Sequence, residues 1–207
     1  LIVVVGGDGT FLKTAQYIRD ATPVLCVTAD TKNTEGFYSD TTAASFEKKI
    51  EHIMKNKIKL KKLWRLIAKK YGQYLEPCLN EYYIGQQKPY DVAKYVLHVQ
   101  GKAEFQKSSG GLVCTGAGST AWCRGAGGKI LPKESKEFQF VVREPYVGKL
   151  IKTKIKKGML KGKDKISIIA KADDMIIVAD ARGKEHLLKK EEKVEIMQYE
   201  KPIFLFY

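Results

Sequence analysis

The chain has 207 residues, 44% hydrophobic and 29% charged, which is typical of a folded protein with one large or two small domains and excludes a disordered chain. No apolar run approaches the roughly 18 residues that a membrane helix needs, so the sequence predicts no membrane span. Lys and Arg number 37 against 23 Asp and Glu, a net charge of +14 that favours nucleic acid, anionic lipid or a phosphorylated small molecule as partner.

The first 58 residues alternate between strand and helix patterns. Residues 1–5 form a β-branched run typical of a strand buried on both faces of a parallel sheet. A glycine turn follows, then apolar residues at helical spacing from Phe11 to Ile18, a second strand over 23–28, a loop over 29–38 and an amphipathic helix from Phe46 to Met54. This alternation predicts a partial parallel α/β domain over residues 1–58. Because the chain begins inside a strand, we expect that an upstream part is missing.

The remainder predicts a mainly antiparallel, sandwich-like β domain over residues 59–198, so the fold class is α/β with two unlike parts. Short strands are expected over 66–70, 80–85, 95–99, 149–156, 165–171, 175–179 and 193–197, with one helix after Gly118. The apolar residues 199–207 should dock back on the first domain. Lysines alternate with apolar residues at Lys152, Lys154 and Lys156, which favours the solvated face of a strand over a binding stripe.

Four cysteines lie far apart in the sequence, at positions 26, 78, 114 and 123, without a C-x-x-C pair. They predict reduced intracellular thiols and indicate neither a disulfide framework nor a zinc site.

The sequence GGDGT at residues 6–10 stands between the first strand and the first helix. Glycines allow the backbone to approach a ligand closely, and the N-terminus of the helix suits a phosphate group. Asp8 is unusual there, because a carboxylate repels phosphate unless it handles a proton or a metal. Asp8 is therefore a candidate general base for a hydroxyl that attacks a phosphoryl group. The plainer alternative is an aspartate that caps the helix.

Two further patterns carry polar groups that suit a ligand. A second glycine-rich turn spans residues 108–122, with Ser119 and Thr120 expected at the N-cap of a helix. The pair Asn80 and Glu81 opens a strand, and an amide beside an acid can recognise two adjacent hydroxyl groups. The plainer alternative for this pair is a polar site on an edge strand.

These three motifs, GGDGT, Asn-Glu and the GSTA of residues 118–121 in the second turn, occur in the order that resembles the NAD kinase family, although lipid kinases and phosphofructokinases share GGDGT alone. The loop TEGFY at 34–38 is similar to that family's loop over the dinucleotide. QKSSG at 106–110, CTGAGS at 114–119 and REP at 143–145 are most similar to the mitochondrial-type branch. Bacterial members instead have Asp at the place of Ser109. The strand and helix that usually precede GGDGT are not in this sequence.

The resemblance implies phosphorylation of the 2′-hydroxyl on the adenosine ribose of NAD, with ATP as donor and Mg²⁺ as cofactor. It implies that Asp8 is the base and that Gly7, Gly9 and Thr10 hold the donor phosphates. It places Glu81 on a ribose diol. The remaining residues that it implies for NAD binding are Phe37, Tyr38, Asn80, Lys107, Ser109, Thr120, Ala121 and Gly125. For Trp122, a place in the core is favoured over stacking on a base.

The alternatives are a lipid or sugar kinase that shares GGDGT, which the Asn-Glu and GSTA motifs disfavour, and a nucleotide-binding module without catalysis, which Asp8 disfavours. Few aromatic residues lie among the lysine runs, which disfavours a nucleic-acid binder. We further expect a homo-oligomer, a dimer or tetramer, with no nucleic-acid or membrane partner. The expected location is cytoplasmic, with a mitochondrial one left open.

Overall fold

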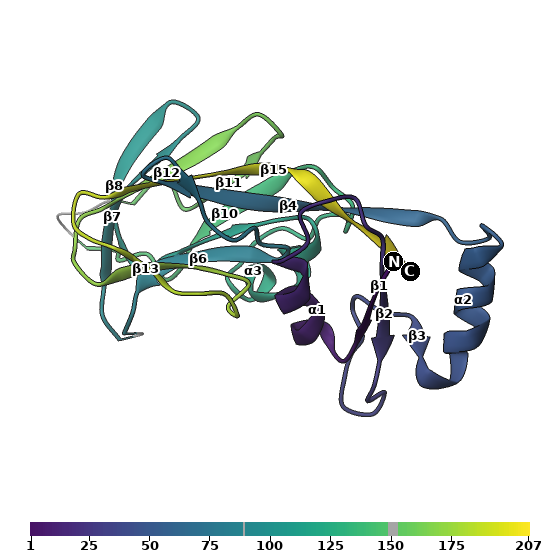
Figure 1. Ribbon diagram of the computed structural model, residues 1–207. Helices are drawn as coiled ribbons and strands as arrows, with labels where there is room; N and C mark the ends of the chain where they lie inside the picture. The colour runs from purple at the N-terminus through teal and green to yellow at the C-terminus, as the bar shows by residue number, and fades with distance from the viewer. Residues whose placement is uncertain (89, 149–152) are drawn as a thin grey trace.

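The computed structural model of the protein describes residues 1–88, 90–148 and 153–207, which form two β-sheets with few helices (Figure 1). Within these residues the larger sheet has nine strands, β1 (Ile2–Val5), β2 (Val24–Thr28), β3 (Thr41–Thr42), β4 (Leu60–Lys70), β5 (Gln73–Tyr74), β7 (Ala93–Val99), β8 (Lys102–Ser108), β12 (Lys165–Ala170) and β15 (Lys193–Phe206). The smaller sheet has six, β6 (Glu81–Gln86), β9 (Gly111–Cys114), β10 (Phe138–Val142), β11 (Lys157–Leu160), β13 (Met175–Ala179) and β14 (His186–Leu188). The helices are α1 (Asp8–Ala15), α2 (Phe46–Met54) and α3 (Trp122–Gly125), with 3₁₀ turns η1 (Ala43–Ser45) and η2 (Ala117–Thr120).

The larger sheet is parallel at one end and antiparallel over the rest. β1, β2 and β3 pair in parallel, and the last residues of β15 also pair in parallel with β2, at Leu205 and Val24. The other pairings are antiparallel, including those of β15 with β4 and β12. The smaller sheet is antiparallel in the order β11-β10-β9-β6-β13-β14. The predicted α/β class, with a parallel part and a sandwich-like antiparallel part, is confirmed.

β15 is one strand from Lys193 to Phe206, so it crosses the expected boundary at residue 199. Its register shifts between Tyr199 and Ile203, beside Pro202. Proline has no backbone donor for the ladder, and a bulge is where a strand accommodates it. The strand therefore joins the parallel and antiparallel parts in one sheet.

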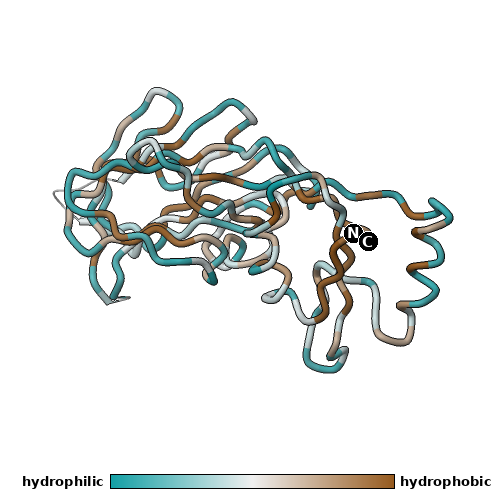
Figure 2. The backbone as a smooth tube through the Cα atoms, in the orientation of Figure 1, coloured by the Kyte–Doolittle hydropathy of each residue, from teal (hydrophilic) through white to brown (hydrophobic). Residues whose placement is uncertain are grey.

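The main core lies between the two sheets, where aliphatic and aromatic side chains of β4, β6, β7, β10, β12 and β13 are buried. A second apolar cluster lies between α1 and the parallel strands and includes Phe11, Val24, Tyr38 and Leu205. Figure 2 shows the hydrophobic stretches along β1, β2 and the sandwich strands, whereas the outer turns are hydrophilic. In the described chain no helix is long and apolar enough to cross a membrane.

Arg65 of β4 is fully buried and fixes the end of α1. Its Nη1 donates to the carbonyls of Ala15 at 2.7 Å and Ile18 at 3.0 Å. Its Nε and Nη2 donate to the carbonyl of Lys201, in the bulge of β15, at 2.9 and 2.6 Å. Carbonyls at the end of a helix lack partners within it, so one guanidinium satisfies them and ties the helix to the sheet.

Two predicted strands need correction. β1 is not buried on both faces: it ends the sheet, pairs with β2, and leaves Val3 and Val5 40% and 63% exposed. Of the strand predicted over 149–156, residues 149–152 lie outside the described chain, including the alternation at Lys152. Residues 153–156 are not a strand, because the amides of Lys154 and Ile155 donate to the carboxylate of Glu104 instead of to a ladder.

Candidate functional site

The glycine turn joins β1 to α1 and is packed closely from both sides. Gly6 has φ +152°, a conformation that side chains rarely adopt. A Cβ on Gly7 would lie 3.1 Å from Cγ2 of Thr34, and one on Gly9 would lie 3.3 Å from Cζ of Arg182. The glycines therefore admit two other segments, the loop after β2 and the turn after β13, close to the N-terminus of α1.

Asp8 is the first residue of α1 and is half-buried. Its Oδ2 accepts from the amide of Phe37 and its Oδ1 from the amide of Tyr38, each at 3.0 Å. No side chain caps α1, so the alternative of Asp8 as a helix cap is wrong. A carboxylate has about four lone-pair positions, so each oxygen retains capacity to accept another hydrogen. Asp8 is thus held in place, and its carboxylate can still accept a hydrogen bond or a proton from a ligand.

Tyr38 links the loop after β2 to the start of β6. Its hydroxyl donates to Oδ1 of Asn80, and its ring packs on Phe11 with centroids 4.8 Å apart. The side chain is only 2% exposed, and burial raises the pKa of its hydroxyl well above the usual range, so the group stays a neutral donor. The relative positions of Asp8 and Asn80 follow from this one side chain.

Asn80 and Glu81 are fixed by a carboxylate from the turn after β13. Asp180 accepts from the amides of Leu79 at 3.0 Å, Asn80 at 2.6 Å and Glu81 at 3.3 Å. Burial raises the pKa of Asp180 to about 6, against the lowering effect of these backbone bonds. Because β6 lies between β9 and β13, the edge-strand alternative for the Asn-Glu pair is wrong.

Glu81 is only 4% exposed, and its Oε2 has no hydrogen-bond partner within the described chain. Burial, followed by the charge of Asp180, raises the pKa of Glu81 to about 8. Buried polar atoms are normally paired, so a lone buried carboxyl oxygen is expected where a ligand completes a site.

These contacts surround a cleft of about 200 Å³, lined by Asp8, Glu35, Phe37, Tyr38, Asn80, Ala117, Thr120 and Ala121. Six of the lining residues are among those predicted from the sequence, and they come from four separate segments of the chain. Gly7, Gly9 and Thr10 flank Asp8, and Glu81 follows Asn80 directly. The lining of the cleft therefore includes a carboxylate at a helix N-terminus and a side-chain amide.

Besides Glu81, three predicted NAD-binding residues are not among those that line this cleft. Lys107 lies beside Tyr146, 5.9 Å from its ring, and the amide of Ser109 donates to the carbonyl of Arg143 at 3.0 Å. Gly125 is exposed at the end of α3, where a Cβ would have open space.

Ser109, through its bond to Arg143, lies near a group of three stacked side chains, those of Tyr83, Trp122 and Arg143. Trp122 stacks on Tyr83 with ring centroids 5.3 Å apart and an angle of 20°, and Arg143 lies over the Trp122 ring at 4.7 Å. Trp122 is 36% exposed, so it is not the core residue that we favoured from the sequence.

The N-cap predicted at Ser119 and Thr120 is also wrong. Ser119 is buried within η2, where its Oγ donates to the carbonyl of Gly116 and accepts from the amide of Leu131. The N-cap of α3 is Ala121, without a capping side chain. The chain turns twice in quick succession here, which leaves Thr120 exposed at the cleft.

Sequence reasoning missed five residues of this region. Glu35 and Ala117 line the cleft and lie inside motifs that had already been singled out. The other three are Lys133, Asp180 and Arg182, whose partners stand far away in the sequence. The aspartate directly after the strand pattern of 175–179 is the one local signal that would have suggested a site residue.

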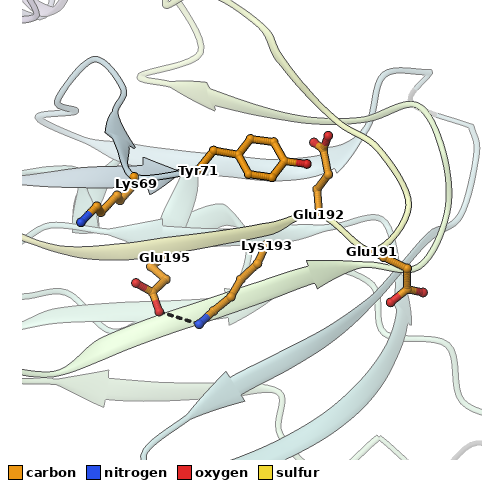
Figure 3. A pocket seen from close by; sticks show the side chains of 7 residues that line it. Lys69, Tyr71, Glu191, Glu192, Lys193 and Glu195 are labelled. Carbon is orange, nitrogen blue, oxygen red and sulfur yellow. Dashed lines mark ion pairs between the residues drawn. The ribbon is translucent and has the colours of Figure 1, made fainter.

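A larger hollow of about 440 Å³ lies elsewhere, at β4, β15 and the turns beside them (Figure 3). Most of its charged groups are in ion pairs: Lys193 with Glu195 at 2.6 Å, as drawn, Glu192 with Lys70 at 2.7 Å, and Glu191 with Lys171 at 2.6 Å. Tyr71 points toward Glu192 in the same view. Since these groups satisfy each other at the surface, the hollow is an ion-paired surface and not the candidate site.

Comparison with known proteins relates the segment that carries Asp8 to a family of kinases. Residues 1–58, which hold the glycine turn and Asp8, match the ATP-NAD kinase N-terminal domain. Over these residues the chain is therefore similar to the NAD kinase family. It is 25% identical over 218 residues to a probable NADH kinase of Oryza sativa, across 95% of this chain and 67% of that protein. It is 28% identical to an NAD kinase of Methanospirillum hungatei, across 71% of this chain and 54% of that protein.

The fold of the whole chain is similar to that of solved NAD kinase structures. A crystal structure of an NAD kinase from Archaeoglobus fulgidus in complex with ATP superposes with a TM-score of 0.81 at 23% identity, over 100% of this chain and 77% of that one. The chain spans between about half and two thirds of the length of these two curated relatives of the NAD kinase family.

Proposed function

We propose that the protein transfers the γ-phosphoryl group of ATP to the 2′-hydroxyl on the adenosine ribose of NAD, yielding NADP and ADP. The observation that carries the proposal is Asp8 at the N-terminus of α1, held by two amides in a cleft that Asn80 also lines. The relatives are named NAD or NADH kinases, and both dinucleotides contain the same adenosine ribose.

In this mechanism the ribose oxygen attacks the γ-phosphorus while the bond to the β–γ bridging oxygen breaks and ADP leaves. Asp8 accepts the hydroxyl proton on a lone pair that its two amide donors leave free. Asn80 and Glu81 orient the dinucleotide, and the amides of the glycine turn face the donor phosphates. The residues thus align the two reacting oxygens, which is most of what phosphoryl transfer needs from a protein.

Magnesium enters the proposal as the ion that accompanies ATP. Mg²⁺ commonly binds through one or two carboxylates together with substrate phosphates, and Asp8 supplies a carboxylate with free lone pairs at the glycine turn. Over the described residues no three His, Cys, Asp or Glu side chains are grouped as metal ligands. The ion would neutralise phosphate charge.

We also propose that copies of the chain associate. Support comes from β1, an edge strand with Val3 and Val5 exposed, because exposed apolar edges pair readily with other strands. Sedimentation at several concentrations tests this, and a monomer throughout would contradict it.

The test of the activity is incubation with ATP, Mg²⁺ and NAD, followed by an NADP-specific dehydrogenase assay. The Asp8→Asn variant keeps the shape but cannot take the proton, so we expect its kcat to fall about 10²- to 10⁴-fold, with NAD binding within a few-fold. The exposed Asp91→Asn serves as a matched control. Wild-type protein that forms no NADP refutes the function, and an Asp8→Asn variant with more than about a tenth of the wild-type kcat refutes the role of Asp8.

A further inference from the structure

Lys133 lies between α3 and β10 and reaches across to the loop after β2. Its Nζ donates to the carbonyl oxygen of Phe37 and lies 4.1 Å from the ring centroids of both Phe37 and Tyr207. The ring of Tyr38 is 5.0 Å away. Ammonium groups are attracted to the faces of aromatic rings, so three rings and one carbonyl hold this cation in place.

The carbonyl that Lys133 contacts belongs to the same peptide unit as the amide of Tyr38. That amide donates to Oδ1 of Asp8 at 3.0 Å. A positive charge on the carbonyl side of a peptide makes its N–H a stronger donor, because hydrogen bonds in a chain polarise one another. One peptide group thus connects the ammonium of Lys133 to the carboxylate of Asp8.

The charge of Lys133 depends on groups from several elements around it. Burial, followed by the charge of Lys61 on β4, lowers the pKa of Lys133 to about 8. Asp8 on α1, Cys26 on β2 and the adjacent Glu134 act in the opposite direction. The phenolic groups of two tyrosines, 38 and 207, complete the titratable groups that face the ammonium.

We propose that Lys133 is a positioning residue for phosphoryl transfer, and that its ammonium keeps Asp8 aligned through the Phe37–Tyr38 peptide. The inference rests on the proposed function, because it takes Asp8 as the base. Lys133 does not need to touch either substrate for this role. When the ammonium loses its proton, the peptide loses its charged partner and the amide of Tyr38 becomes a weaker donor to the carboxylate of Asp8.

Two substitutions separate this role from simple packing. Lys133→Met keeps the apolar stem without the charge, and Lys133→Arg keeps a charge that does not titrate near neutral pH. The exposed Lys129→Met, four residues earlier, is the matched control. We expect Lys133→Met to lower kcat about ten- to a hundredfold, as expected for a small misplacement of a reacting group, with the KM for ATP nearly unchanged. In wild-type protein kcat should fall above about pH 8, and this alkaline decline should vanish in Lys133→Arg.

A second measurement does not depend on activity. Hydrogen exchange at the amides of Phe37 and Tyr38 should be faster in Lys133→Met than in Lys129→Met, because those amides then bind Asp8 less firmly. The inference is overturned if exchange is unchanged, if kcat of Lys133→Met stays within twofold, or if Lys133→Arg retains the alkaline decline. Wild-type protein without NADP synthesis would refute the proposed function instead, and the exchange experiment would still decide whether Lys133 anchors the loop.

Discussion

Glu81→Gln is expected to change how the stability of the protein depends on pH. The wild-type side chain is 4% exposed, and burial, together with the charge of Asp180, raises its pKa to about 8. In the unfolded chain a glutamate has a pKa of 4.5. Between these two values the folded protein holds a proton on Glu81 that the unfolded chain has lost.

The sign and size of the effect follow from this difference in bound protons. A group whose pKa is raised by folding contributes its full stability below the unfolded pKa, and the contribution is lost as pH rises through the folded pKa. Each pH unit in between removes about 1.4 kcal/mol. From pH 6 to pH 8 the wild type should therefore lose about 2 kcal/mol of unfolding free energy through Glu81, a loss that the uncharged Glu81→Gln does not undergo.

The assay is urea unfolding of the wild type, Glu81→Gln and the exposed control Glu47→Gln at pH 6 and pH 8. Glu47→Gln should follow the wild type, whereas Glu81→Gln should gain relative to both at the higher pH. Parallel pH dependence of all three proteins would refute the reasoning, because Glu81 would then be ionised in the folded state. A protonated Glu81 also matters for binding, because it presents a donor as well as acceptors to a ribose.

Two more substitutions test contacts that position the cleft. Arg65→Met should lower the unfolding free energy by about 3 kcal/mol in urea titrations, because it strips buried carbonyls such as that of Lys201 of a charged donor; a loss below about 1 kcal/mol would contradict the clamp. Arg182→Ala should raise the KM for ATP about tenfold with the KM for NAD unchanged, because the guanidinium lies over Gly9, in the turn where we propose that the donor phosphates bind. Lys184→Ala is its control, and equal effects of the two variants on KM would remove Arg182 from the donor site.

Local patterns in the sequence were sufficient for the elements that hold the site. GGDGT links a strand to a helix as predicted, although its last three residues already form the first turn of α1, and the helix pattern from Phe46 to Met54 matches α2. These features depend on neighbouring residues only: glycine where the chain must turn tightly, and apolar residues at the helical period. The pattern of residues 1–5 was less informative, because β-branched runs occur on edge strands as well as on central ones.

Long-range partners could not be predicted in this way. Lys133 and Phe37 stand 96 positions apart, and Asp180 stands 101 positions from Leu79. No periodicity indicates which distant backbone a charged side chain meets, since that depends on which strands pair. The same applies to β15, which the sequence analysis divided at residue 199 and which the structure continues through a bulge beside Pro202.

The cleft is organised by carboxylates that bind backbone amides of other segments. Asp8 holds the loop after β2, and Asp180 holds the start of β6. The hydroxyl of Tyr38 joins the two held segments at Asn80. Hydrophobic packing alone tolerates small shifts, whereas a buried carboxylate with several amide donors favours one geometry, because any unpaired group is costly in a medium of low dielectric constant. A reaction that aligns two oxygens across a phosphorus atom needs such fixed distances, so residues that never touch a substrate are expected to affect kcat.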